Sequence, residues 1–109
     1  MYEFRGNMAE KYGLNAAVVA EYLYTAKGDL ERMEFLEYNW MRCSARQITI
    51  DNPFLTVDMV KYAIRTLRED GVIRSKKIRK SGFDHTNWYT FTEYGRNLME
   101  GGNPDDTKN

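Results

Sequence analysis

The sequence predicts a single mixed α+β domain in which a β-hairpin follows a series of helices. Several segments place apolar residues at helical spacing and end at glycine, whereas others alternate large and polar side chains as short strands do. The chain has 109 residues, of which 42% are hydrophobic and 14% aromatic, so it can form one core and is too short for two. This composition also argues against a wholly disordered chain.

Two helices are predicted in the N-terminal quarter. A short helical turn over residues 7–12 is expected to end at Gly13. Asn15 is then expected to cap a second helix, whose apolar residues recur at helical spacing from Ala16 until Gly28. This helix carries one apolar stripe and is therefore expected to pack on the core.

The following segment predicts a short strand and a third helix. Residues 29–37 are acidic and fit either a short helix or a loop that leads into an extended segment. Residues 38–43 alternate large and polar side chains, which predicts a strand. Ser44 can then cap a short helix over residues 45–50, which the turn containing Pro53 ends.

The best-defined helix covers residues 57–70. Thr56 can cap its N-terminus, and Gly71 follows its last residue, where a left-handed conformation is favoured. At about 100° per residue, the apolar and polar side chains separate onto two faces. The apolar face, expected in the core, carries Val60, Ala63, Ile64 and Leu67, and the other face carries Asp58, Lys61, Tyr62, Arg65, Arg68 and Glu69.

A β-hairpin and a last helix complete the predicted domain. Residues 72–79 predict a half-basic strand, residues 80–85 contain a turn, and residues 86–92 predict the returning strand. Thr92 can cap a helix over residues 93–100, with Leu98 and Met99 facing inward. Residues 101–109 have no large apolar side chain and predict a disordered tail, so the domain spans residues 1–100.

This order of elements predicts a winged helix-turn-helix, with a three-helix core, a short strand plus a β-hairpin wing, and a C-terminal helix. Residues 45–50 and 57–70, with the turn at 51–55, would form the helix-turn-helix. The second helix of this motif enters the major groove of double-stranded DNA. DNA is therefore the partner that the predicted fold favours.

The charges are unevenly distributed along the chain. Basic and acidic residues number 16 each, yet residues 61–80 hold eight basic residues against two acidic ones. Such a cluster indicates a surface for a polyanion, with a solvated, salt-bridged surface as the alternative. The cluster falls on the helix and hairpin that a winged helix-turn-helix turns toward DNA, which favours DNA binding.

Arg65 is expected to contact a guanine, because its forked guanidinium can satisfy two acceptors at once. Lys61 and Arg68 are expected on phosphates, and Asp58 could accept from a cytosine amino group. The basic hairpin residues would lie beside the DNA backbone or minor groove, where they add affinity but little sequence information. The candidate DNA-binding residues are Thr56, Asp58, Lys61, Tyr62, Arg65, Arg68, Lys76, Lys77, Arg79 and Lys80.

Other classes of function find less support. The carboxylates are dispersed and no phosphate-cradling glycine-rich loop or nucleophile elbow is present, so we expect neither an enzyme nor a cofactor. One cysteine, Cys43, and one histidine cannot supply the four ligands of a structural zinc site. A lone cysteine also excludes an internal disulfide and fits a reducing cytoplasm. No apolar run approaches the roughly 18 residues that cross a membrane.

The competing interpretation is a protein–protein interaction module on a winged-helix scaffold, because a fold alone does not settle function. The N-terminal part of the chain is rich in aromatic residues. Some of these side chains could form a homodimer interface instead of core. They are Tyr2, Phe4, Tyr12, Tyr22 and Tyr24.

Residues 13–19, 39–42, 52–73 and 84–91 together resemble the winged-helix domain of replisome-organiser and replication-initiation proteins. Those proteins occur in Gram-positive bacteria, their phages and other mobile elements. The pairing of Asn52-Pro-Phe-Leu with Thr86-Asn-Trp-Tyr-Thr is the most specific part, and it implies a role in replication initiation. Those domains tend to have Thr and Arg where this chain has Met59 and Tyr62, so their base preference does not carry over.

The second half of the chain also resembles transcription regulators of the MarR and PadR types. The resemblance rests on the run Trp88-Tyr-Thr-Phe-Thr-Glu-Tyr-Gly-Arg, at the exit of the predicted hairpin. It implies a role in transcriptional regulation, beside the role in replication.

Overall fold

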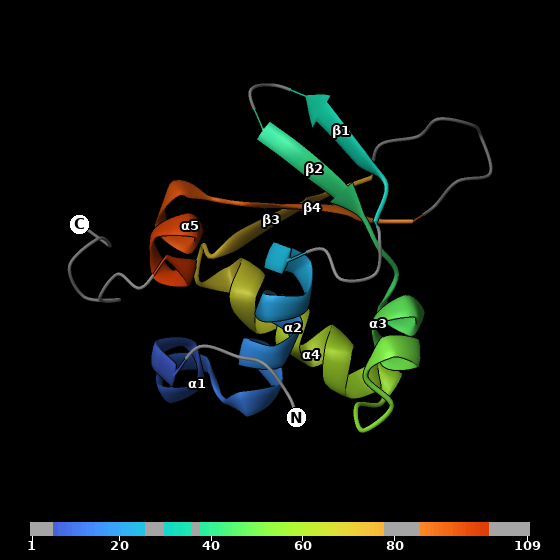
Figure 1. The fold of residues 1–109 in the computed structure, drawn as a ribbon, viewed down its shortest axis with the longest axis vertical. Helices are drawn as coiled ribbons and strands as arrows, with labels where there is room; N and C mark the ends of the chain where they lie inside the picture. Colours follow the sequence, from blue (N-terminus) through green and yellow to red (C-terminus); the bar gives the residue numbers. More distant parts are fainter. Residues whose placement is uncertain (1–5, 26–29, 36–37, 78–85, 101–109) are drawn as a thin grey trace.

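The computed structural model describes residues 6–25, 30–35, 38–77 and 86–100, and its fold is mixed α+β, as predicted (Figure 1). The helices are α1 (Gly6–Tyr12), α2 (Leu14–Thr25), α3 (Ala45–Asp51), α4 (Val57–Glu69) and α5 (Glu93–Met99). The strands are β1 (Arg32–Phe35), β2 (Tyr38–Arg42), β3 (Ile73–Lys76) and β4 (Trp88–Phe91). They form one antiparallel sheet in the order β1-β2-β4-β3.

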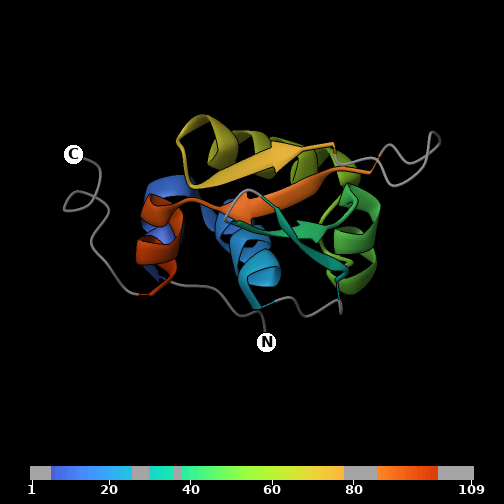
Figure 2. The same cartoon turned by 90° about the horizontal axis from the view of Figure 1, so that it is seen from above.

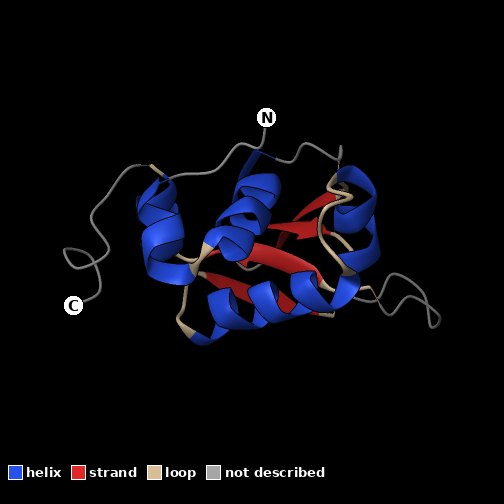
Figure 3. Cartoon of the chain, turned by 90° about the horizontal axis from the view of Figure 1, so that it is seen from below, coloured by secondary structure: helices blue, strands red, loops and turns tan. Residues whose placement is uncertain are grey.

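The sheet and the helices pack as two layers. In Figure 1 the strands cross the upper part of the molecule, with α2 and α4 beneath them, and Figure 3 shows these helices in front of the sheet. Strand side chains that point toward the helices, such as Ile73 and Phe91, join the same buried cluster as Leu23 of α2 and Leu67 of α4. Because each such burial contributes about 1.5–3 kcal/mol, this interface is the main source of stability.

Helix α4 forms as its local signals predict. The Thr56 side chain accepts a hydrogen bond from the Met59 N–H at 3.1 Å, and Gly71 has φ 77° just after the C-cap residue Asp70. The helix ends at Glu69, one residue before the predicted end. Its buried residues are the four of the predicted apolar face, Val60, Ala63, Ile64 and Leu67.

The caps of the two short C-proximal helices are also confirmed. The Ser44 side chain accepts from the N–H of Gln47 at the start of α3, and the Thr92 side chain accepts from the N–H of Gly95 at the start of α5. Leu98 and Met99 are fully buried, as expected for the inward face of α5. The strands predicted over 38–43 and 86–92 exist as β2 and β4.

The prediction that Asn15 caps the second helix is wrong, because α2 already begins at Leu14. The preceding residue, Gly13, has φ 92°, its N–H donates to the Ala9 carbonyl at 2.9 Å, and its own carbonyl accepts from the Ala17 N–H at 3.1 Å. A single glycine therefore ends α1 and starts α2. This arrangement needs a residue in the left-handed conformation, which glycine adopts without steric cost.

The acidic segment, for which the sequence left a short helix and an extended path open, contains strand β1. Met33 of β1 lies opposite Trp40 of β2, so the two strands form a hairpin at one edge of the sheet. At the other edge, β3 runs alongside α4 (Figure 2) and ends at Lys76, before the predicted end at 79. The predicted turn over 80–85 and the predicted tail over 101–109 lie outside the described residues.

Candidate functional site

The outer face of α4 carries the charged residues that the sequence singled out. Asp58, Lys61, Arg65 and Arg68 are all exposed, opposite the buried apolar face of the same helix. Tyr62 on this face is 64% exposed. Thr56 is exposed as well, but its hydroxyl is occupied in capping the helix. We call Lys61, Arg65 and Arg68 the basic face of α4.

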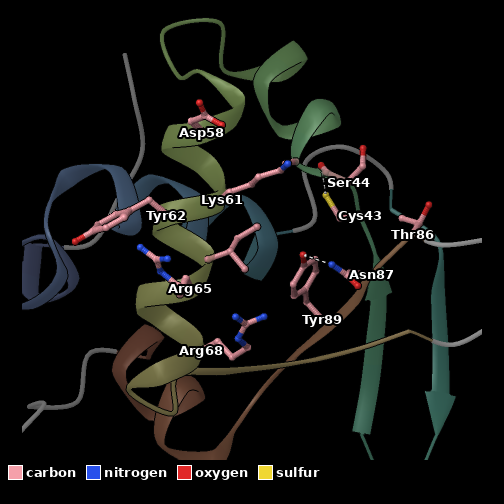
Figure 4. Close-up of a pocket in the computed structure, with 12 residues that line it drawn as sticks. Cys43, Ser44, Asp58, Lys61, Tyr62, Arg65, Arg68, Thr86, Asn87 and Tyr89 are labelled. Atoms are coloured by element: carbon pink, nitrogen blue, oxygen red, sulfur yellow. Dashed lines mark hydrogen bonds between the residues drawn. The ribbon is translucent and has the colours of Figure 1, made fainter.

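The basic face borders a hollow of about 870 Å³ between α4 and the sheet (Figure 4). On the helix side it is lined by Asp58, Lys61, Tyr62, Ile64, Arg65 and Arg68. On the other side it is lined by Cys43, Ser44 and Ala45 at the start of α3 and by Thr86, Asn87 and Tyr89 on or just before β4. The hollow therefore joins segments that lie far apart in the sequence.

The three cations of the basic face are spaced four and three residues apart, so they lie along one side of the helix. Figure 4 shows Lys61 reaching toward Ser44, whereas Arg68 extends from α4 toward the side of the sheet where Tyr89 lies. The Arg68 guanidinium also makes a long hydrogen bond of 3.4 Å to the hydroxyl of Ser75 on β3. These positions spread positive charge along the whole length of the hollow.

Arg65 is held differently, beside an aromatic ring. Its guanidinium carbon lies 5.2 Å from the centroid of the Tyr62 ring, within the range of a cation–π interaction. At an exposed site such a contact contributes about 0.5–1 kcal/mol, enough to favour one orientation of a long side chain. Tyr62 thus limits the directions in which the Arg65 fork can point.

The wall opposite the basic face consists of uncharged polar groups. Tyr89 is only 4% exposed, and its hydroxyl oxygen accepts a hydrogen bond of 3.4 Å from the side-chain amide of Asn87. Burial raises the pKa of the Tyr89 hydroxyl, an effect that the hydrogen bond from Asn87 and the charge of Arg68 partly offset, so the hydroxyl keeps its proton at neutral pH.

Asn87 and Tyr89 were not predicted as site residues from the sequence. Asn87 comes just before β4 and Tyr89 two residues later, so the alternation of extended backbone places them on the same face, and this alternation was visible in the sequence. Nothing local, however, indicated that α4 would lie beside that face. The order of strands in the sheet decides it.

The basic residues of β3 lie on the face of the sheet that points away from α4. Ser75 lies opposite Tyr89 on the face toward α4, so its neighbour Lys76, which lies opposite Trp88, faces the other side of the sheet. Arg74 shares that side, where its guanidinium lies 5.4 Å from the centroid of the Tyr38 ring. The structure therefore does not bring Lys76 into the hollow with the basic face.

Positive charge nevertheless continues around the edge of the sheet. A second hollow, of about 790 Å³, is lined by Arg68 together with Arg74 and Lys76. Lys77 follows directly after β3 and is exposed. Arg79 and Lys80, the other two basic residues predicted for the hairpin, lie outside the described residues.

Cys43 borders the first hollow but is not a reactive group. It is 1% exposed, and burial, followed by the charge of Asp51, raises the pKa of its thiol to about 12. A thiol that stays protonated is a poor nucleophile and a poor metal ligand. Within residues 6–25, 30–35, 38–77 and 86–100, no cluster of His, Cys, Asp and Glu side chains could hold a metal ion.

None of the helices in the described part of the chain is long and apolar enough to cross a membrane. Comparison with models of known families finds no family that matches the chain, and comparisons with curated proteins and with solved structures find no match either.

Proposed function

We propose that this chain is a winged helix-turn-helix protein that binds double-stranded DNA and catalyses no reaction. The observation that carries the proposal is the basic face of α4, where three exposed cations share one side of a helix anchored by its opposite, apolar face. Residues 52–56 join α3 to α4, as the turn of a helix-turn-helix would.

The dimensions of α4 suit the major groove. Its 13 residues make a helix about 20 Å long, and a helix with side chains is about 10–12 Å across, close to the width of that groove. In this arrangement Arg65 reads a base edge, while Lys61 and Arg68 contact phosphates. The β3–β4 hairpin acts as the wing and adds Lys76 and Lys77 beside the DNA backbone.

The biological role proposed with this activity is replication initiation or transcriptional regulation in the cytoplasm, in a phage or another mobile element. It rests on the sequence resemblance to replication-initiation proteins and to MarR-type and PadR-type regulators. Both roles use the same surface, so one binding experiment addresses them together.

A second candidate function is a protein–protein interaction module, including a homodimer. Apolar side chains at the surface favour it, since Ile50 is 69% exposed and Leu14 is 51% exposed. Ile50 lies on α3 and Leu14 on α2, and neither lines the hollow beside the basic face. Sedimentation of the protein at micromolar concentration would detect a dimer formed through them.

The test of DNA binding is fluorescence anisotropy with a random-sequence duplex at about 50 and 200 mM salt. We expect binding that weakens steeply with salt, with a slope of log K against log salt near −5 if about six phosphates are neutralised. Replacing both Lys61 and Arg68 by Ala should reduce affinity strongly and flatten this slope by about two.

A matched control replaces two exposed cations elsewhere, Lys11 on α1 and Arg96 on α5, by Ala. This control has the same net charge as the test variant. Similar binding by both variants would show that the loss of affinity follows from the lower total charge and not from the basic face. Absence of binding by the folded wild-type protein at either salt concentration would overturn the proposed function.

A further inference from the structure

The hollow beside α4 has two walls of different chemistry. One wall is the basic face, Lys61, Arg65 and Arg68, with Asp58 as the single carboxylate at one end. The facing wall offers neutral donors, chiefly the Asn87 amide and the Tyr89 hydroxyl. In their hydrogen bond the Tyr89 oxygen is the acceptor, so its O–H proton keeps the capacity to donate.

This combination suits an anion that presents several acceptor oxygens. Three cations against one carboxylate leave the hollow net positive, and cations with neutral donors are the groups that contact phosphate oxygens in protein–DNA complexes. A cation would be repelled by the basic face, and one carboxylate has only two oxygens to offer to three cations and two neutral donors.

The length of the hollow indicates more than one phosphate. Lys61 and Arg68 are seven residues apart, about 10 Å along the helix axis. One strand of DNA advances about 3.4 Å per nucleotide along the duplex axis, and its phosphates lie farther apart than this because the strand winds around the axis, so the distance spans about two to three phosphates. A volume of about 870 Å³ likewise exceeds what a single phosphate group fills.

We infer that the hollow holds the phosphodiester backbone of one DNA strand, bound between Lys61 and Arg68 of α4 and the side chains of Asn87 and Tyr89, while Arg65 keeps its contact with a base edge. This inference rests on the proposed DNA-binding function and adds a second wall to the proposed binding site. The DNA strand would be held from two sides. Residues on or just before β4 would contribute contacts to DNA, whereas the sequence predicted such contacts only for α4 and for the basic residues of the hairpin.

The two walls differ in one measurable respect. A cation that contacts a phosphate releases a counterion, so its removal changes the salt dependence of binding, whereas a neutral donor releases none. We therefore expect Asn87→Ala and Tyr89→Phe each to weaken binding about five- to tenfold on every duplex, with the salt slope unchanged. Lys61→Ala should weaken binding and make the slope shallower by about one.

The experiment measures anisotropy with three unrelated duplexes over a salt series, for the full chain and these three variants. Asn97→Ala, an exposed asparagine on α5, is the matched control and should bind as the wild type does. Circular dichroism melting of each variant verifies that it is folded. Tyr89→Phe keeps the buried ring, so it tests the hydroxyl alone.

The outcomes separate this inference from the function on which it rests. If Lys61→Ala weakens binding while Asn87→Ala and Tyr89→Phe do not, DNA binding stands and the two-walled site is overturned. A loss confined to one duplex sequence would make Asn87 a base contact and overturn the backbone assignment. No DNA binding by the wild type would instead remove the proposed function.

A free phosphate compound shares the chemistry of the backbone, and melting experiments distinguish the two. We expect duplex DNA to raise the melting temperature more than inorganic phosphate supplied at the same concentration of phosphate groups. An equal rise with inorganic phosphate, abolished by Asn87→Ala, would assign the hollow to a small phosphate ligand and overturn the backbone assignment.

Discussion

Arg65 lies at the centre of the basic face, with its guanidinium against the ring of Tyr62. The sequence favoured this residue because an arginine fork can satisfy two acceptors of a guanine. The structure adds a neighbouring ring that restrains the orientation of the fork. Restraint of a long side chain lowers the conformational entropy that binding must remove. Each contact that the side chain makes then contributes more to the binding free energy.

Replacing Arg65 by Ala is expected to cost about 1–3 kcal/mol on a selected DNA site and to relax the base preference there. Arg65→Lys should recover much of the binding to random duplexes but not to the selected site, because lysine keeps the charge and loses the fork. Anisotropy with both kinds of duplex measures the difference. Equal losses on selected and random DNA would contradict the assignment of Arg65 to a base.

Cys43 provides a prediction about pH. Its thiol has a native pKa of about 12, against 9.0 without the protein environment. Between these values the unfolded chain binds fewer protons than the native one, so the thiol lowers the free energy of unfolding as pH rises above 9. Below pH 9 both states are protonated and this loss is absent.

The measurement is urea unfolding of the wild type and of Cys43→Ala at pH 7 and pH 10. The variant has no thiol to titrate, so the stability advantage of the wild type should shrink by about 1 kcal/mol at the higher pH. All other groups titrate in both proteins and cancel in the comparison. An advantage that stays constant with pH would show that the thiol ionises in the native state as readily as in the unfolded state.

At the scale of single elements, α5 is fixed to the sheet by two residues. The Thr92 hydroxyl accepts from the Gly95 N–H at 2.9 Å and also donates to the backbone, with the carbonyls of Gly71 and Val72 at 2.5 and 3.2 Å. Gly95 is buried against the same segment, and a Cβ at this position would lie 2.0 Å from the Val72 carbonyl oxygen. The helix can approach the backbone just before β3 only because residue 95 has no side chain.

Gly95→Ala is therefore expected to destabilise the protein by about 2–3 kcal/mol, although alanine is the better helix former. Urea unfolding followed by circular dichroism measures the change. Asn97→Ala on the exposed side of α5 is the matched control, and we expect it to change stability by less than about 0.5 kcal/mol. A stabilised Gly95→Ala variant would mean that α5 does not pack as closely as described.

At the scale of the whole molecule, tyrosine hydroxyls join helices that are distant in the sequence. Tyr22 of α2 donates to the carboxylate of Asp51, the last residue of α3, at 2.6 Å. Tyr12 of α1 donates to Asp70 after α4 and also contacts the hydroxyl of Tyr94 on α5, at 3.1 Å. These bonds connect α2 to the end of α3, and α1 to the end of α4 and to α5. They therefore help to fix the orientation of α4 and of its basic face.

Removal of the Tyr22 hydroxyl in Tyr22→Phe is expected to lower the free energy of unfolding by about 1.5–3 kcal/mol, because the bond has a charged acceptor and is partly buried. Tyr62→Phe, which removes an exposed hydroxyl, should cost less than about 0.5 kcal/mol. Thermal or urea unfolding gives both values. Equal losses would indicate that the hydrogen bond to Asp51 does not stabilise the native state.

The local sequence by itself determined α4, from its cap at Thr56 to the left-handed Gly71, and determined the exposed cations on its outer face. These features depend on residues a few positions apart, which is the range over which helix periodicity and capping operate. The caps at Ser44 and Thr92 were predictable for the same reason. The α+β class followed from the order of such locally encoded elements.

Only the tertiary structure decided that residues 32–35 form a strand and that Asn87 and Tyr89 face the basic face of α4. A strand is stable only through hydrogen bonds to a partner strand, and a hollow exists only between elements that packing brings together. Neither depends on the spacing of neighbouring residues. The sequence therefore determined which cations this protein exposes, and the packing of α4 against the sheet decided which neutral groups stand opposite them.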